Sequence, residues 1–298
     1  ALDDSGNVYV TGYINSAYNN CGYAIIKYNP DGVQQWIKQY EGPGGSEDKP
    51  TAIAVDGSGN VYVTGNSVGL LYHDYATIKY NSAGDTLWIR RYNGLASDQD
   101  YATALAIDTD GNVYVTGYST GTGSLTDCAT IKYSSAGVQQ WVSRYNGPSN
   151  SYDYAFAISV DDSGNVYIAG STYSSTTWND YLTVKYNSSG VQQWVQTYDD
   201  SIHVDDWVNS MSLDGLGNVY ITGKSLGFAT IKYNSSGVEQ WIRKYNGLGY
   251  GNDVASAVKT DLFGNVYVTG NNITLSSSEF VTIKYNTSGV QQWLQTYD

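Results

Sequence analysis

The chain of 298 residues has few basic side chains. Lysine and arginine together number 15 against 28 aspartates and glutamates, which gives a formal net charge of −13 at pH 7. Nucleic acids and anionic membranes both require a basic protein face, so this balance argues against either as a partner. Long apolar stretches are also missing. No apolar run approaches the ~18 residues of a membrane-spanning helix, and we expect no membrane insertion.

Cysteine, histidine and the common catalytic motifs are equally scarce. The only cysteines are Cys21 and Cys128, and the only histidines are His73 and His203. There is no Cys-x-x-Cys pair, no zinc-type spacing, no Gly-x-Ser-x-Gly turn and no phosphate-binding glycine loop. These absences exclude the motif-bearing enzyme classes and leave carboxylates and histidines as the groups available for catalysis.

One phrase, Gly-Asn-Val-Tyr-(Val/Ile)-(Thr/Ala)-Gly, returns six times along the chain. Its copies occupy residues 6–12, 59–65, 111–117, 164–170, 217–223 and 264–270, with start-to-start spacings of 53, 52, 53, 53 and 47 residues. A tryptophan keeps the same period, at Trp36, Trp88, Trp141, Trp194, Trp241 and Trp293. A period near 50 in an all-β pattern is typical of a β-propeller, in which each repeat forms one four-stranded blade. We place these six tryptophans in the core.

The sequence therefore predicts an all-β fold, a six-bladed β-propeller with four antiparallel strands per blade. We expect a single domain over residues 1–298, with units of approximately 1–47, 48–99, 100–152, 153–205, 206–252 and 253–298. The first blade should lack most of its inner strand, of which only Ala1 and Leu2 remain. We interpret the chain as a trimmed piece of a longer protein, and an unpaired strand edge in the first blade predicts an inter-chain contact there.

The second unit shows how each blade should be built. Strands are predicted at 48–56, 61–65, 75–80 and 86–92, because hydrophobic residues alternate there and turn residues separate them. The turn after each first strand starts with an aspartate that can accept backbone N–H groups: Asp56, Asp108, Asp161, Asp214 and Asp261. Both variable loops should lie on the face opposite the short turns, so a ligand site is expected on the variable-loop face. Because Cys21 and Cys128 fall in non-adjacent blades, we expect two free thiols.

The repeat resembles a known family. Residues 127–141, 144–148 and 157–170 read Asp-Cys-Ala-Thr-Ile-Lys-Tyr through Gln-Gln-Trp, then Arg-Tyr-Asn-Gly-Pro, then a stretch ending in Gly-Asn-Val-Tyr-Ile-Ala-Gly. This sequence pattern resembles the SBBP family of β-propeller repeats, and the resemblance covers the whole chain. It implies a secreted bacterial or archaeal protein, and it brings no catalytic residues with it.

Five aspartates recur at the start of the predicted first strands: Asp48, Asp100, Asp153, Asp206 and Asp253. Converging carboxylates could hold Ca²⁺ or another hard cation through oxygen ligands. The alternative is structural, with each aspartate bound to the backbone or to one of the repeated lysines, because buried charges must be paired. Those lysines are Lys27, Lys79, Lys132, Lys185, Lys232 and Lys284. A second set of partners for them is Asp74, Asp127, Asp180 and Glu279.

Two tryptophans depart from the period, Trp178 in a variable loop and Trp207 directly after Asp206. We expect them to lie on one face with further candidates for ligand binding: Tyr152, Tyr173, His203, Asp205 and Asp206. Such a group suits a sugar ring, which stacks on aromatic faces while carboxylates bind its hydroxyl groups. The alternative is that Trp207 packs between blades and Trp178 shields a loop.

The preferred function is a secreted, non-enzymatic binding or scaffold module of a larger extracellular protein, with carbohydrate or protein as partner. A carbohydrate-active enzyme using the first-strand carboxylates, with His203 as a possible acid or base, is the main rival. A structural surface component is the third reading. Abundant tyrosine and glycine, 30 and 33 residues, favour secretion. Four Asn-x-Ser/Thr acceptors are candidate glycosylation sites or simple turns: Asn187, Asn234, Asn272 and Asn286.

Overall fold

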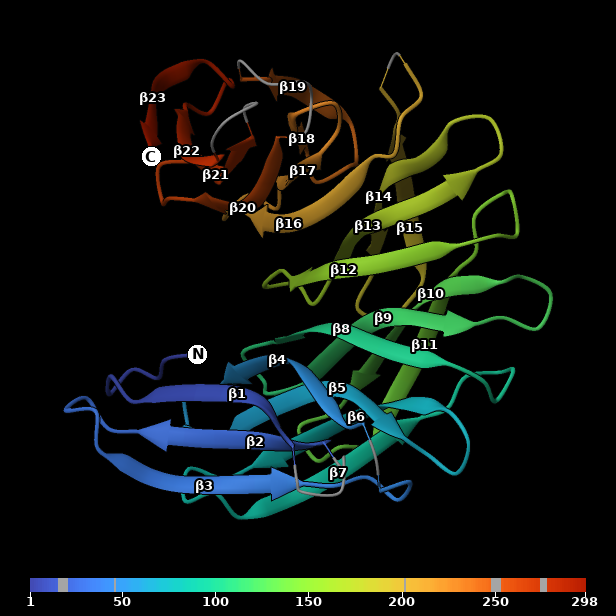
Figure 1. The fold of residues 1–298 in the computed structure, drawn as a ribbon, viewed down its shortest axis with the longest axis vertical. Helices are drawn as coiled ribbons and strands as arrows, with labels where there is room; N and C mark the ends of the chain where they lie inside the picture. The colour runs from blue at the N-terminus through green and yellow to red at the C-terminus, as the bar shows by residue number, and fades with distance from the viewer. Residues whose placement is uncertain (16–20, 46, 201, 248–252, 274–277) are drawn as a thin grey trace. The chain divides into compact units, whose positions relative to one another are not determined.

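The computed structural model describes residues 1–15, 21–45, 47–200, 202–247, 253–273 and 278–298. These residues form two compact units, Ala1–Asn146 and Gly147–Asp298, and every named element in them is a β-strand (Figure 1). Within the described ranges, no helix is present that could span a bilayer.

The first unit contains three antiparallel sheets in which consecutive strands are neighbours: β1-β2-β3, β4-β5-β6-β7 and β8-β9-β10-β11. The strand bounds are β1 (Val8–Asn15), β2 (Cys21–Tyr28), β3 (Gln34–Tyr40), β4 (Lys49–Val55), β5 (Val61–Val68), β6 (His73–Tyr80), β7 (Thr86–Tyr92), β8 (Asp100–Ile107), β9 (Val113–Thr120), β10 (Thr126–Tyr133) and β11 (Gln139–Tyr145). The incomplete first sheet follows the prediction: a single bridge, Leu2 to Val8, stands where the other sheets carry a whole strand.

The second unit repeats the pattern in three four-stranded sheets. The strand bounds are β12 (Asp153–Val160), β13 (Val166–Ser174), β14 (Trp178–Tyr186), β15 (Gln192–Tyr198), β16 (Trp207–Leu213), β17 (Val219–Lys224), β18 (Phe228–Tyr233), β19 (Glu239–Tyr245), β20 (Val254–Thr260), β21 (Val266–Ile273), β22 (Ser278–Tyr285) and β23 (Gln291–Tyr297). The predicted all-β repeat of up-and-down strands is thus confirmed. The single domain over residues 1–298 and the inter-chain contact at the first sheet stay predictions.

One aspartate organises the tight turn before each second strand. Asp56 Oδ1 accepts the backbone N–H groups of Ser58 and Asn60, both at 2.9 Å, while Oδ2 accepts Asn60 Nδ2 and the Tyr62 hydroxyl, both at 2.8 Å. Burial alone would raise the pKa of Asp56, but these hydrogen bonds outweigh it and hold the pKa below its usual value. The other turn aspartates accept the corresponding backbone N–H groups, which confirms their predicted role, and each also accepts a tyrosine hydroxyl.

The central two strands of each sheet supply most of the buried side chains. In the second sheet, Val61, Tyr62 and Val63 of β5 and Ala76 and Ile78 of β6 are fully buried. Removing this apolar surface from water is the main stabilising term of the fold. The last strands are more exposed, so the predicted core position of the periodic tryptophans holds only in part: Trp88 and Trp241 are buried, whereas Trp293 is 38% exposed.

The periodic tryptophans instead connect consecutive repeats. Trp88 Nε1 and Lys79 Nζ both donate to the carbonyl oxygen of Ser135 in the next repeat, at 3.2 and 3.1 Å. The same pair of bonds runs from Trp36 and Lys27 to Ser82, from Trp194 and Lys185 to Ser235, and from Trp241 and Lys232 to Thr287. For these four lysines, pairing with the first-strand aspartates is therefore wrong, because their ammonium groups bind a backbone carbonyl.

Two arginines add a second connection on the last strands. Arg144 of β11 bonds Asp127 Oδ2 at 2.9 Å, Ser119 Oγ and carbonyl oxygen at 2.7 and 2.8 Å, and the hydroxyl of Tyr92 in the preceding repeat at 3.1 Å. Arg91 makes the corresponding contacts one repeat earlier. Asp74 and Asp127, which the sequence offered as lysine partners, are thus neutralised by arginine.

Candidate functional site

The five first-strand aspartates are buried, at most 1% exposed, and share one backbone contact. Each accepts, on Oδ2, the N–H of the residue six positions earlier. The donors are Gly42 for Asp48, Gly94 for Asp100, Gly147 for Asp153, Asp200 for Asp206 and Gly247 for Asp253. The structure thus gives these carboxylates the backbone role that the sequence analysis left open as the alternative to a metal ring.

The residue that donates this backbone N–H is glycine in four repeats. In most of these repeats a serine or threonine side chain of the second strand lies against the glycine and leaves no room for a Cβ. A Cβ placed at Gly94 would lie 2.2 Å from Ser119 Oγ, and one at Gly42 would lie 2.1 Å from Ser67 Oγ. In the fifth repeat this position is Asp200, whose Cβ occupies that space. The Ser225 hydroxyl lies beside Asp206. Asp206 Oδ1 has no hydrogen-bond partner, and the same is true of Asp100 Oδ1 in a repeat that keeps the glycine.

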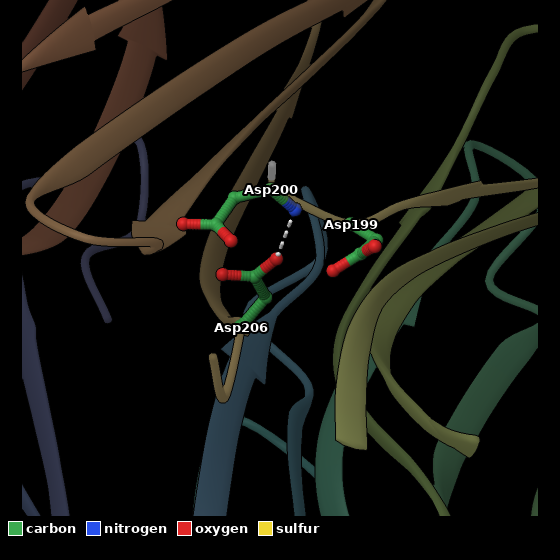
Figure 2. A group of neighbouring side chains, drawn as sticks. All are labelled: Asp199, Asp200 and Asp206. Carbon is green, nitrogen blue, oxygen red and sulfur yellow. Dashed lines mark hydrogen bonds between the residues drawn. The ribbon is translucent and has the colours of Figure 1, made fainter. Parts of the chain in front are cut away.

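This substitution assembles a group of three carboxylates, Asp199, Asp200 and Asp206, shown in Figure 2. One oxygen from each lies within 4.8 Å of the others. Asp200 and Asp206 are 2% and 0% exposed, and Asp199 is partly buried. Among the residues with described positions, this is the one group of three or more ligating side chains close enough for a single ion, and of the five first-strand aspartates only Asp206 belongs to it.

Burial and mutual repulsion dominate the electrostatics of this acidic group. Burial, together with the charges of Asp200 and Asp199, raises the pKa of Asp206 to about 7, against the opposing effect of the Ser225 hydroxyl and the Asp200 N–H. A carboxylate in such surroundings is unstable in its charged form unless a cation or a proton neutralises it.

A row of aromatic rings lies along the first strands of the fourth and fifth repeats. Tyr152 and Tyr154 are nearly parallel, with centroids 6.1 Å apart and planes at 6°. Phe156 continues the row 6.0 Å from Tyr154, and Trp207 of β16 lies 6.0 Å from both Tyr154 and Phe156. Tyr152 lies directly before β12, and Tyr154 and Phe156 lie on it, with Phe156 at the β-bulge between Ala155 and Ala157. We call Tyr152, Tyr154, Phe156 and Trp207 the aromatic row.

The other candidate ligand-binding residues gather at the neighbouring end of these strands. Tyr173 donates its backbone N–H to the Tyr152 carbonyl. Trp178, 59% exposed with φ at 68°, begins β14 opposite the end of β13. Asn179 Nδ2 donates to Asp205 Oδ1 at 2.7 Å. Tyr152, Tyr173, Trp178, Asp205 and Trp207 are thus brought to one region, whereas Asp206 points into the acidic group.

The two histidines take separate places. His203 Nδ1 lies 2.5 Å from Asp199 Oδ2, so this ring contacts the acidic group rather than the aromatic row. His73 lies against Tyr101, with ring centroids 5.1 Å apart, and its Nε2 lies 3.9 Å from Glu47. Burial lowers the pKa of His73 despite the nearby charge of Glu47.

Sequence reasoning missed Tyr154, Phe156, Asp199 and Asp200. The signal for the first two was available, since the positions that follow Asp153 hold two aromatic residues where the second repeat has Lys49 and Thr51. The signal for Asp200 was its place six residues before a first-strand aspartate, where the other four repeats have glycine.

The glycosylation and thiol predictions have mixed outcomes. Asn187, Asn234 and Asn286 each close a tight turn, where the side-chain oxygen accepts two backbone N–H groups. Asn272 is 4% exposed, and a buried carboxamide cannot carry a glycan in the folded chain. Cys128 is a buried free thiol, while the side chain of Cys21 lies outside the described residues.

The short-turn face of the second unit exposes a group of large apolar side chains. Turns of the fifth and sixth repeats expose Leu216, Leu262 and Phe263, at 82%, 103% and 83%, and these residues line one hollow with Leu213 and Thr260. Exposed apolar groups of this kind commonly mark contact surfaces.

Comparison with known proteins is consistent with this architecture. The family model "SBBP: Beta-propeller repeat" matches residues 35–72, 87–123, 140–175 and 202–228. No curated protein sequence matches the chain.

Three similar solved structures share only 11% sequence identity with the chain, so the likeness concerns the fold alone. One is a protein of unknown function from Bacteroides caccae, with a TM-score of 0.52 and coverage of 97% of this chain and 93% of that one. The Dos1 propeller has a TM-score of 0.60, with coverage of 97% and 74%. An ulvan lyase, a polysaccharide lyase bound to -[GlcA(1-4)Rha3S]-, has a TM-score of 0.59, with coverage of 100% and 82%. Together with the repeated sheets and turns, these matches show an all-β fold of the β-propeller type, with SBBP β-propeller repeats in the four matched segments.

Proposed function

We propose that this chain is a secreted, non-enzymatic carbohydrate-binding module, and that the aromatic row of the fourth and fifth repeats is its binding surface. The proposal takes the six sheets as six blades of one propeller, as the repeat spacing predicts. The observation that carries it is the set of four neighbouring rings on, or directly before, two adjacent first strands.

Partial exposure of the row supports ligand binding. Tyr152 is 43% exposed and Tyr154, Phe156 and Trp207 are half-buried, so the rings are supported from beneath while their edges or faces remain accessible. Aromatic side chains offer a large, rigid contact area at low entropic cost. The apolar faces of sugar rings pack well on such surfaces.

Polar groups near the row provide partners for sugar hydroxyl groups. Asn179 and Asp205 form a hydrogen-bonded pair at the adjoining strand end, and Tyr152 contributes a phenol. Binding sites typically combine a mainly aromatic surface with a few placed polar groups of this kind.

Binding without catalysis is the simpler reading of these residues. Asp153, at the start of the strand that carries the row, accepts the Gly147 N–H and the Thr172 hydroxyl, which commits it to the fold. The likeness to an ulvan lyase concerns the fold, and it motivates only the choice of acidic polysaccharides among the probes.

The test is a glycan array followed by calorimetric titration of the best oligosaccharide. Trp207→Ala should weaken binding about 30-fold, since truncating a central aromatic contact costs about 2 kcal/mol. The affinities of Phe156→Ala and Trp178→Ala show how far the binding site extends along β12 and toward the start of β14. Tyr297→Ala removes an aromatic residue that is 73% exposed in the last strand, and it should leave the affinity unchanged.

Two results would contradict this function. The aromatic row would not be a saccharide site if the folded wild-type chain bound no glycan on the array. The same conclusion would follow if Trp207→Ala bound the oligosaccharide with the affinity of the wild-type chain. Depolymerisation of the bound oligosaccharide would support the carbohydrate-active enzyme instead.

A further inference from the structure

We propose that Asp199, Asp200 and Asp206 form a Ca²⁺ site at the connection between the fourth and fifth repeats. This inference goes beyond the proposed saccharide binding and does not depend on it. Its starting point is the replacement of a repeat glycine by Asp200, which places a second buried carboxylate beside Asp206.

The spacing of the oxygens suits one ion. Ca²⁺ binds six to eight oxygen ligands at 2.3–2.6 Å, so two ligands on opposite sides of it lie about 5 Å apart. The three carboxylate oxygens lie within 4.8 Å of one another. Asp199 Oδ1, Asp200 Oδ2 and Asp206 Oδ1 are all buried atoms without a hydrogen-bond partner. Each residue therefore has an oxygen available for coordination.

A fourth carboxylate, outside this group of three, adds to the negative charge around it. Asp180 of β14 is only 8% exposed, and its Oδ1 has no hydrogen-bond partner. Its charge repels that of Asp199 and so contributes, after burial, to a raised pKa of Asp180. In the second and third repeats the corresponding Asp74 and Asp127 are paired with arginine.

The missing arginine explains the excess of negative charge. Arg91 and Arg144 directly precede the last tyrosine of their strands, and the fourth repeat has Thr197 at that position. Lys244 is the nearest replacement, but it bonds the Tyr198 hydroxyl and contributes only a longer-range charge to Asp200 and Asp206. Within the described chain, the three carboxylates form no ion pair with a lysine or arginine, and Asp199 alone meets His203.

The donor chemistry selects the type of ion. The available ligands are carboxylate oxygens, with the Ser225 hydroxyl beside Asp206, and hard oxygen ligands favour Ca²⁺ or Mg²⁺ over softer metals. Mg²⁺ requires near-ideal octahedral geometry at 2.0–2.1 Å and sheds water reluctantly. A buried group of separated carboxylates on a loop suits the larger and more adaptable Ca²⁺.

Calorimetric titration of CaCl₂ into the chelator-treated chain at pH 7.5 tests the proposal. We expect one Ca²⁺ per chain, with Mg²⁺ at least tenfold weaker. Asp200→Gly should abolish binding while preserving the fold, because glycine occupies this position in four other repeats. Thr197→Arg supplies the guanidinium that the second and third repeats use, and it should weaken Ca²⁺ binding more than about tenfold, the scale of changes around a metal site.

A matched control and a second variant keep the test decisive. Asp162→Asn removes an exposed carboxylate from the same unit, so it should not change the affinity. If Asp200→Gly fails to fold, Asp199→Asn at the partly exposed rim serves in its place. No heat with millimolar Ca²⁺, or unchanged affinity in both Thr197→Arg and the cluster variant, would overturn the site.

Discussion

The contact between consecutive repeats can be tested by adding one methyl group at Gly137. This glycine of the third repeat has φ at 78°, and a Cβ there would lie 2.8 Å from the indole ring of Trp88. Gly111 in the other tight turn of that repeat has nearly the same backbone, with φ at 75°, but its Cβ would meet Ser135 and Tyr62 at 3.4 and 3.6 Å. The pair therefore separates backbone strain from packing against tryptophan.

The expected magnitudes follow from these contacts. Both alanine variants carry the left-handed backbone cost of about 1–2 kcal/mol, and Gly137→Ala adds the overpacking cost of about 1–3 kcal/mol. With a denaturant slope of roughly 3 kcal/mol/M, Gly137→Ala should unfold about 0.3–1 M earlier in urea than Gly111→Ala.

Urea unfolding followed by tryptophan fluorescence measures this difference. Equal midpoints for the two variants would refute the view that Trp88 packs tightly under the next repeat. A urea midpoint for Gly137→Ala equal to that of the wild-type chain would additionally show that the two repeats are not held together at this turn.

Three further predictions concern charge. Arg144→Met should destabilise the chain by about 3–5 kcal/mol in urea, because it leaves buried Asp127 unpaired; a loss below 1 kcal/mol would count against the arginine connection. Hydrogen bonds hold the pKa of turn residues such as Asp56 below 3.8, so their stabilisation is present above pH 4 and is lost as pH falls through the lowered pKa; a urea midpoint at pH 2.5 equal to that at pH 6 would contradict this. The pKa of Asp206 is raised to about 7, so the folded chain keeps a proton that the unfolded chain releases above pH 4, and stability in chelator should fall as pH rises from 4 to 7. Asp206→Asn should reduce that fall, and an identical pH profile in thermal unfolding would exclude Asp206 as its source.

The repeat made the scaffold predictable from sequence. The Gly-Asn-Val-Tyr phrase and its preceding aspartate correspond to the tight turn and second strand, because turn geometry and strand alternation are local properties. The lysine partner was not predictable, since Lys79 reaches the carbonyl of Ser135 in another repeat, and only the packing of consecutive sheets brings these residues together.

In the candidate sites, too, local features could be predicted from the sequence and contacts between distant residues could not. Trp207 could be selected because it departs from the tryptophan period, whereas the contacts of Tyr154 and Phe156 with it depend on the packing of two strands. Asp200 acquires its meaning from the space that Ser119 and Ser67 occupy beside the corresponding glycines. That space is a property of packed side chains, so the acidic group could be identified only in three dimensions.

The most direct test of the central claim is a crystal structure of the chain with the best oligosaccharide from the array. The account predicts a sugar ring in contact with Tyr154 and Trp207, with its hydroxyl groups directed toward Asn179 and Asp205. A saccharide bound elsewhere on the chain, with the aromatic row free, would contradict it.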